Sequence, residues 1–196
     1  DHPKTVSYLD VITGCVPVGE KVAIIGAGGI GFDVAEFVTH SGRSSALDID
    51  LFATEWGIDF KNHPRGGVTG IEPRIVSNGR KVILLQRKES AVGKTLNSTP
   101  GWTHRLRLQR RGVDMIAGVE YLKIDDRGLH ARVAGEPRLF EVETVIVCAG
   151  QEPARELFDA LVAAGLPARL IGGAFEAAEL DAKRAIKQAT ELAASL

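Results

Sequence analysis

Three glycines, Gly26, Gly28 and Gly31, are spaced as G-x-G-x-x-G. Between a strand and a helix, this spacing is typical of a site for the diphosphate of a dinucleotide. The first glycine permits the tight turn, the second lets the diphosphate approach the backbone, and the third lets the helix pack closely on the strand. The start of the helix offers free N–H groups, so we predict that these residues, with Gly29 and Ile30, bind a diphosphate. The alternative is a glycine-rich turn that binds nothing.

A second position with possible chemistry is the basic pair Arg87 and Lys88, which follows the apolar run at residues 81–86. In a dinucleotide-binding fold, the end of the second strand meets the adenosine ribose. An acidic residue there accepts from the 2′-OH of NAD, whereas cations accommodate the 2′-phosphate of NADP. Arginine can bind a phosphate through two parallel N–H bonds, and lysine adds a point charge. The pair therefore predicts NADP(H) rather than NAD(H); the alternative is a solvated basic pair that ends a strand.

The glycine motif is weak unless a strand precedes it and a helix follows it. Residues 21–25, KVAII, form a short apolar run typical of a parallel strand that is buried on both faces. After the glycines, the apolar residues recur at helical spacing and form one stripe, namely Ile30, Val34, Phe37 and Val38. The sequence therefore predicts a strand, a glycine turn and a helix, in that order.

Residues 41–80 break this pattern, because they mix six glycines with two prolines. A connection of about 40 residues far exceeds the usual 2–6 residues between a helix and a strand. We therefore predict an insertion that is functional, an interaction surface or disordered, with some packing around Trp56. Because of this insertion we place Arg87 by its strand rather than by the usual offset of about 20 residues from the glycines.

The segment at residues 101–112 has the pattern of a helix that ends at a glycine. Its Trp102 and Arg105 are candidates to cover the adenine end of a nucleotide, and a solvated basic helix is an equally open interpretation. His104 is interpreted as a surface residue, because no acid or nucleophile motif accompanies it.

Short strands follow. A strand is predicted at 113–117, and alternation with turn residues predicts a small antiparallel meander at 119–124, 129–133 and 138–142. The apolar run at 144–148 predicts another core strand. It ends in Ala149 and Gly150, and small residues at this position allow backbone and nucleotide to approach each other.

The organisation changes beyond Gly150. We predict an amphipathic helix at 154–164, a short strand at 168–171, a turn at Gly172 and Gly173, and a last helix from about Ala182. One strand between two helices cannot bury itself alone, so this tail must dock elsewhere or complete a sheet.

The predicted fold class is α/β, with a Rossmann-like parallel sheet and a small antiparallel meander. The predicted domains are a linker with a short helix at 1–19, a nucleotide-binding domain at 20–150 with the insertion at about 41–80, and the tail at 151–196.

Composition limits the classes of partner. The chain has 196 residues, is 44% apolar and 25% charged, and has a net charge of −1. This balance argues against nucleic acid and anionic membranes as partners, and no run approaches the roughly 18 apolar residues of a membrane span. Cys15 and Cys148 are interpreted as free thiols in the cytoplasm, and no metal site is predicted. Because the first residue is Asp1 rather than Met, we expect the chain to be a piece of a longer protein.

A family resemblance extends over essentially the whole chain. In order, the sequence contains the blocks VAIIGAGGIGFDVAEF, LLQRK, GWTHR, VIVCAGQEPAR and LIGGAFEAAELDAKRAI. Together these resemble the C-terminal portion of bacterial 2,4-dienoyl-CoA reductases, iron–sulfur flavoenzymes of the NADH:flavin oxidoreductase class that are related to trimethylamine dehydrogenase. The resemblance implies an NADPH-binding domain of the glutathione-reductase type, inserted between two segments of a FAD-binding domain.

The same resemblance implies a role for the tail. Residues 151–196 would be the returning FAD segment, and Gly173, Leu180, Asp181 and Ala182 would be the part of the FAD site in this chain. Gly173 stands where the commoner flavoprotein pattern has an aspartate, so its contact would be made by the backbone.

The implied activity is hydride delivery from NADPH to FAD, for reduction of 2,4-dienoyl-CoA in fatty-acid β-oxidation. Enzymes that resemble this chain carry FMN on a barrel and hold a four-iron, four-sulfur cluster with cysteines. With two cysteines and no room for a barrel of about 250 residues, we expect both groups only in the parts of the parent outside this chain. No catalytic residue is therefore predicted. The alternatives are a non-catalytic domain that senses a dinucleotide, and a self-sufficient NADP-dependent dehydrogenase.

Overall fold

The computed structural model describes residues 2–62, 70–96, 99–177 and 182–196. The chain divides into two compact units, Asp1–Ala149 and Gly150–Leu196. Each unit is described by itself below.

The first unit is built on a parallel sheet of five strands in the order β1-β8-β2-β3-β4. The strands are β1 (Thr5–Ser7), β8 (Thr144–Val147), β2 (Lys21–Ile25), β3 (Lys81–Leu85) and β4 (Asp114–Ile116). Every neighbouring pair is parallel. The central strand β2 is buried on both faces, as its apolar sequence predicts. The predicted α/β fold class is confirmed, although the short edge strand β1 was not foreseen in the linker segment.

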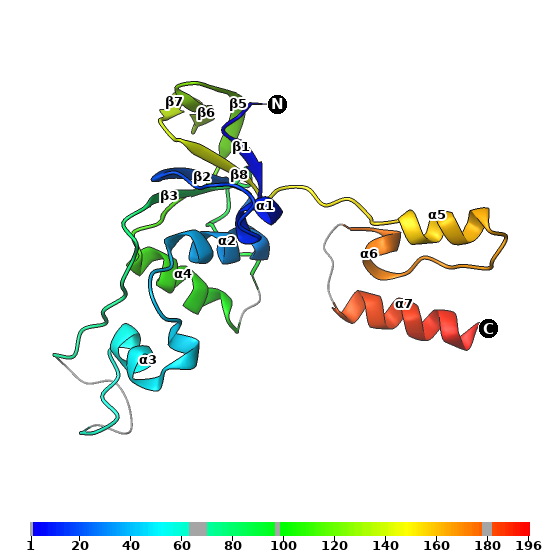
Figure 1. Cartoon of the computed structure of the whole chain (residues 1–196), viewed down its shortest axis with the longest axis horizontal. Coiled ribbons are helices and arrows are strands. Elements are labelled where there is room, and N and C mark those ends of the chain that lie inside the picture. Colours follow the sequence, from blue (N-terminus) through cyan, green and yellow to red (C-terminus); the bar gives the residue numbers. More distant parts are fainter. Residues whose placement is uncertain (1, 63–69, 97–98, 178–181) are drawn as a thin grey trace. The chain divides into compact units, whose positions relative to one another are not determined.

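Side chains that alternate along the central strands separate two cores. Val22 and Ile24 of β2 pack against helices α2 (Gly29–Thr39) and α4 (Gly101–Arg110), while the intervening Ala23 packs toward the meander. Figure 1 shows α2 and α4 on one face of the sheet and the meander on the other. The short helix α1 (Tyr8–Ile12) joins the helical layer.

The meander is an antiparallel sheet in the order β5-β6-β7, with strands β5 (Val119–Asp125), β6 (Gly128–Val133) and β7 (Glu136–Phe140). The prediction of a small meander is confirmed. Its third strand begins and ends two residues earlier than the predicted range of 138–142.

Part of the insertion is helical. It forms a 3₁₀ turn, η1 (Ser45–Leu47), and helix α3 (Ile49–Trp56), and neither was predicted. Asp48 caps α3 by accepting from two backbone N–H groups. The ring of Trp56 lies 5.6 Å from the guanidinium of Arg107 and 5.3 Å from that of Arg110, both on α4. The predicted packing around Trp56 is confirmed, and these cation–π contacts attach the described part of the insertion to the helical layer.

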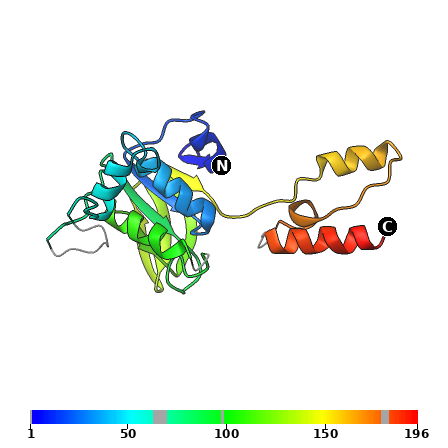
Figure 2. The same ribbon diagram turned by 90° about the horizontal axis from the view of Figure 1, so that it is seen from below.

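The second unit contains helices α5 (Glu156–Ala163), α6 (Gly172–Phe175) and α7 (Ala182–Ala194), which Figure 2 shows from a second direction. The prediction of a strand at 168–171 is wrong, because those residues form no regular element. A short apolar run needs a neighbouring strand, and the described part of this unit has none. Gly172 and Gly173 begin α6 rather than forming a simple turn, and the Gly172 N–H donates to Gln188 at 2.7 Å.

Helices α5 and α7 bury none of their residues. Leu157 is 73% exposed and Ile186 is 64% exposed, so both helices carry uncovered apolar side chains. Over the described ranges of the chain, no helix is both long enough and apolar enough to cross a membrane.

Candidate functional site

The glycine turn joins β2 to α2 and presses closely on its neighbours. Gly26 has a φ of +108°, and its N–H donates to the carbonyl oxygen of Leu85 at 2.9 Å. A Cβ atom on Gly26 would come within 2.8 Å of the Cys148 carbonyl group, and one on Gly31 would overlap the Gly26 carbonyl oxygen. The steric roles predicted for these two glycines are therefore present: Gly26 makes the tight turn, and Gly31 brings the helix against it.

The other two glycines of the turn face open space. A Cβ atom on Gly28 or Gly29 would meet nothing within 4 Å. Gly28 is the N-cap of α2 without a side-chain cap, and the first turn of the helix has no acidic residue. The first intrahelical bond runs from the Phe32 N–H to the Gly28 carbonyl at 3.1 Å, so the N–H groups before it have no acceptor within the helix. This end of α2 is suited to an anion that approaches the bare backbone.

A cavity of about 210 Å³ adjoins this turn at the carboxyl ends of β2 and β3. It is lined by Ile25, Gly26, Ala27 and Gly28 of the turn, by Gln86, Arg87 and Lys88 after β3, and by Thr95, Tyr121 and Ala149. Arg87 and Lys88 therefore lie at the same cavity as glycines that precede them by more than 50 residues. From the predicted set, the structure brings together Gly26, Gly28, Arg87, Lys88 and Ala149.

Both cations of this cavity are available for an external anion. Arg87 and Lys88 are exposed, and within the described part of the chain neither side chain has a hydrogen bond or an ion pair. By contrast, Arg107 binds Glu36 at 2.7 Å. A cation with unused donors and no carboxylate partner is what recognition of a phosphate requires.

The loop that carries these cations is held by Gln86. The side-chain amide of Gln86 donates to the carbonyl oxygens of Lys88, at 3.0 Å, and Ser90, at 2.5 Å. Because the amide satisfies the backbone inside the turn, the side chains of Arg87 and Lys88 remain outside it. Gln86 is thus a positioning residue for the basic pair.

Two predicted residues do not line this cavity. Trp102 and Arg105 on α4 are not among the cavity's lining residues, and Trp102 is 60% exposed. On the same helix, Nδ1 of His104 lies 3.9 Å from a carboxylate oxygen of Glu36, on α2. His104, which lies between Trp102 and Arg105 in the sequence, is therefore part of the contact between α4 and α2.

The remaining candidates divide between the two units. Gly29, Ile30 and Gly31 form the first turn of α2. Gly150, Gly173 and Ala182 belong to the second unit, while Leu180 and Asp181 lie outside the described residues.

Tyr121, Gln86 and Thr95 line the cavity although sequence reasoning did not select them. Gln86 could have been found, because it ends the strand that Arg87 follows. No sequence pattern indicated Tyr121, because tertiary contacts of the meander bring it to the cavity. Burial raises the pKa of Tyr121 to about 12, and the positive charge of Arg87 partly opposes this shift.

Cys148 lies at the end of β8, beside the glycine turn. Burial raises the pKa of its thiol to about 12, so the thiol stays protonated and unreactive near neutral pH. Cys148 packs against the core on the helical side of the sheet.

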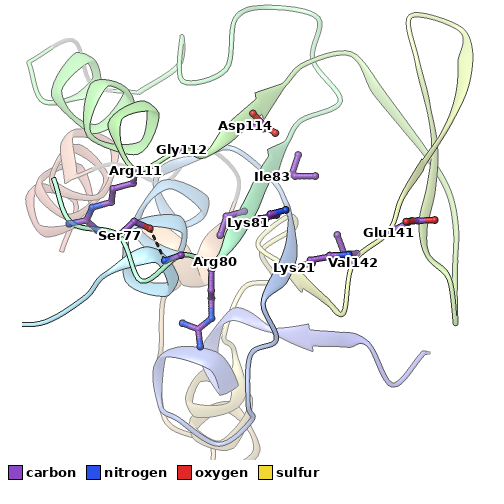
Figure 3. A pocket seen from close by; sticks show the side chains of 12 residues that line it. Lys21, Ser77, Arg80, Lys81, Ile83, Arg111, Gly112, Asp114, Glu141 and Val142 are labelled. Carbon is purple, nitrogen blue, oxygen red and sulfur yellow. Dashed lines mark hydrogen bonds between the residues drawn. The ribbon is translucent and has the colours of Figure 1, made fainter. Parts of the chain in front are cut away.

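A second cavity, of about 480 Å³, lies at the opposite edge of the sheet, where β2, β3 and β4 begin (Figure 3). Lys21, Lys81 and Asp114 line it with the first side chains of those strands. The guanidinium of Arg80 donates to the carbonyl oxygens of Gly19 at 3.1 Å, Val38 at 3.0 Å and Val18 at 3.3 Å. Arg80 therefore stabilises the fold with its donors.

Comparison with known proteins assigns the chain to a family. Residues 8–174 match the family model described as pyridine nucleotide-disulphide oxidoreductase. The chain belongs to the pyridine nucleotide-disulphide oxidoreductase family. Members of this family bind FAD and NAD(P).

Relatives of this pyridine nucleotide-disulphide oxidoreductase domain are much longer proteins. A metal reductase of Desulforamulus reducens is 23% identical over 158 residues, which cover 81% of this chain and 22% of the relative. A 2-naphthoyl-CoA reductase structure is 19% identical with a TM-score of 0.65, covering 94% of this chain and 22% of that one. Histamine dehydrogenase from Rhizobium sp. 4-9 is 19% identical with a TM-score of 0.59, covering 93% and 24%. The chain thus spans about a quarter or less of the length of these relatives.

Proposed function

We propose that this chain is the NADPH-binding part of a larger flavoprotein reductase. One observation carries the proposal: the unpaired cations Arg87 and Lys88 share a cavity with the glycine turn. In a dinucleotide-binding fold these two places receive the 2′-phosphate of NADP and the diphosphate, respectively. The bare surface beside Gly28 and the uncapped start of α2 fit a diphosphate, and the two free cations fit a phosphate monoester.

Each part of the site has its own task in this proposal. The N–H groups at residues 29–31 bind the diphosphate. The guanidinium of Arg87 donates two parallel hydrogen bonds to the 2′-phosphate, and Lys88 adds a positive charge. Ala149 keeps the end of β8 small, so that the coenzyme can pass close to the backbone. NADPH, when bound, supplies a hydride, and the residues of this chain bind and orient it.

We further propose that the hydride acceptor is FAD and that residues 151–196 are the returning segment of the FAD-binding domain. The uncovered apolar side chains of α5 and α7 support this, because such helices need a partner to bury them. In this proposal Gly173, Leu180, Asp181 and Ala182 contact FAD.

For the parent protein we propose the reduction of 2,4-dienoyl-CoA in fatty-acid β-oxidation, in the cytoplasm, with FMN and a four-iron, four-sulfur cluster in the parts outside this chain. This assignment is supported by the resemblance of the five sequence blocks to 2,4-dienoyl-CoA reductases.

Titration of the chain with NADPH and NADH tests the coenzyme assignment. Charged hydrogen bonds to the 2′-phosphate are worth about 1.5–3 kcal/mol, so we expect NADPH to bind about 10- to 150-fold more tightly. The Arg87→Asp variant should lose this preference, because a carboxylate repels the phosphate. Equal affinities in the unsubstituted chain would overturn the assignment. NADPH-driven flavin reduction by the full-length parent then separates a hydride-delivering domain from a regulatory sensor.

A further inference from the structure

Tyr121 lines the cavity, and no role has yet been assigned to its buried hydroxyl group. Its hydroxyl oxygen is shielded from solvent and has no hydrogen-bond partner among the described residues. The residue lines the same cavity as Arg87 and Lys88. A buried hydroxyl without a partner is costly, so a group of this kind in a native site calls for an explanation.

The position of Tyr121 is coupled directly to the loop of the basic pair. The N–H of Gly118 donates to the Lys88 carbonyl at 3.0 Å, and the N–H of Val119 donates to the Gln86 carbonyl at 3.0 Å. These two bonds flank Arg87 and tie the start of β5 to its loop.

Tyr121 follows Val119 by two residues, so both side chains lie on the same face of β5. Val119 is 1% exposed in the core beneath the meander, which fixes that face. The register of β5 on β6 shifts immediately after Tyr121, and such bulges often aim a side chain at a site.

Electrostatics decides which role the hydroxyl can play. Its pKa is raised to about 12, mainly by burial, so the phenol keeps its proton at neutral pH. The charge of Arg87 acts on the same hydroxyl. A protonated hydroxyl beside a free guanidinium is a donor, and the acceptor that suits both is an anionic oxygen.

We propose that the Tyr121 hydroxyl donates a hydrogen bond to the phosphate monoester that Arg87 and Lys88 bind, and thereby selects NADPH over NADH. This inference rests on the proposed function and deepens it. A phosphate monoester has three oxygens, enough to accept from a guanidinium, an ammonium and a phenol together. The meander would then be part of coenzyme selection, and one of the three ligands would be neutral.

The test is the Tyr121→Phe variant, with Tyr8→Phe as the control because Tyr8 lies on α1 and outside the cavity. We expect Tyr121→Phe to weaken NADPH binding about tenfold, as for a charge-assisted hydrogen bond, while NADH binding changes by less than about twofold. Tyr8→Phe should change neither affinity. The melting temperature of Tyr121→Phe should be unchanged or higher, because the hydroxyl has no partner within the described protein.

Other outcomes would overturn the inference in distinguishable ways. Equal losses for NADPH and NADH would mean that the ring only packs, and no loss for either would mean that the hydroxyl binds nothing. If the unsubstituted chain itself does not prefer NADPH, the proposed function fails and this inference fails with it. If it does prefer NADPH and Tyr121→Phe keeps the full preference, only this inference fails.

Salt dependence of NADPH binding provides a second readout. Lys88→Ala should lower the slope of log Kd against log salt, because it removes a cation from the site, whereas Tyr121→Phe should leave that slope unchanged. A reduced slope in Tyr121→Phe would show that the substitution disturbs the basic pair itself and would contradict the inference.

Discussion

The two edges of the parallel sheet use the same residue type in opposite ways. At the edge where β2 and β3 begin, the guanidinium of Arg80 donates hydrogen bonds to three backbone carbonyl groups. At the edge where these strands end, Arg87 is exposed and makes no such bonds within the described residues. An arginine is therefore informative about ligands only when its donors are free.

The largest effect is expected in the glycine turn, where one glycine packs against the backbone and another faces open space. Gly31→Ala should destabilise the protein by about 3 kcal/mol or more, because its Cβ would overlap the Gly26 carbonyl oxygen. Gly28→Ala is the matched control, since its Cβ meets nothing within 4 Å and its φ of −83° suits alanine. It should change stability by at most about 0.5 kcal/mol and weaken NADPH binding. Urea unfolding and titration measure both effects; equal stability of the two variants would refute the assignment of roles within the turn.

Alanine substitutions of the two arginines come next in expected size. Arg80→Ala should lower the free energy of unfolding by about 2–3 kcal/mol, because it removes the donors of three carbonyl groups. Arg87→Ala should leave stability within about 0.5 kcal/mol and weaken NADPH binding by about 1.5–3 kcal/mol. If Arg87→Ala lost stability but kept its affinity for NADPH, Arg87 would have a structural role like that of Arg80, and the contrast between the two arginines would be contradicted.

A smaller effect is expected at Gln86. Gln86→Leu removes both side-chain hydrogen bonds that shape the loop, so we expect about 1 kcal/mol of lost stability and a three- to tenfold weaker NADPH affinity. Gln109→Leu on the exposed side of α4 is the control and should have neither effect. If Gln86→Leu bound NADPH as tightly as the unsubstituted chain, the loop would not depend on this amide.

The last effect is absent at neutral pH and concerns the thiol beside the turn. The folded protein holds the Cys148 proton more tightly than the unfolded chain, with a pKa raised from 9.0 to about 12 by burial. The stability from this burial is complete below pH 9 and is lost as the pH rises toward 12. Cys148→Ala should therefore show a shallower decline of stability between pH 9 and 11, measured by urea unfolding. If the stability of Cys148→Ala declined in parallel with that of the unsubstituted chain, the buried state of this thiol would be contradicted.

Much of the fold follows from local sequence patterns. Continuous apolar runs predict β2, β3 and β8, and alternation with turn residues predicts the meander. Helix α3 was missed because the glycines and prolines of the insertion surround it, and its anchor, the contact of Trp56 with two arginines of α4, is a tertiary contact. The strand predicted at 168–171 was wrong because strand formation depends on a neighbour that a local pattern does not show.

The candidate site divides in the same way. The cavity shared by the glycine turn and Arg87 could be anticipated across the insertion, because the carboxyl ends of parallel strands meet at one edge of a sheet. Tyr121 could not, because its place depends on how the meander packs on the loop after β3. Trp102 and Arg105 were selected by their place in the chain and are not among the residues that line the cavity.

A crystal structure of the chain with bound NADP⁺ would test the central claim most directly. We predict that the 2′-phosphate lies within hydrogen-bond distance of the Arg87 guanidinium, with the diphosphate at the N–H groups that begin α2. A 2′-phosphate bound elsewhere, with Arg87 and Lys88 still in solvent, would contradict the assignment.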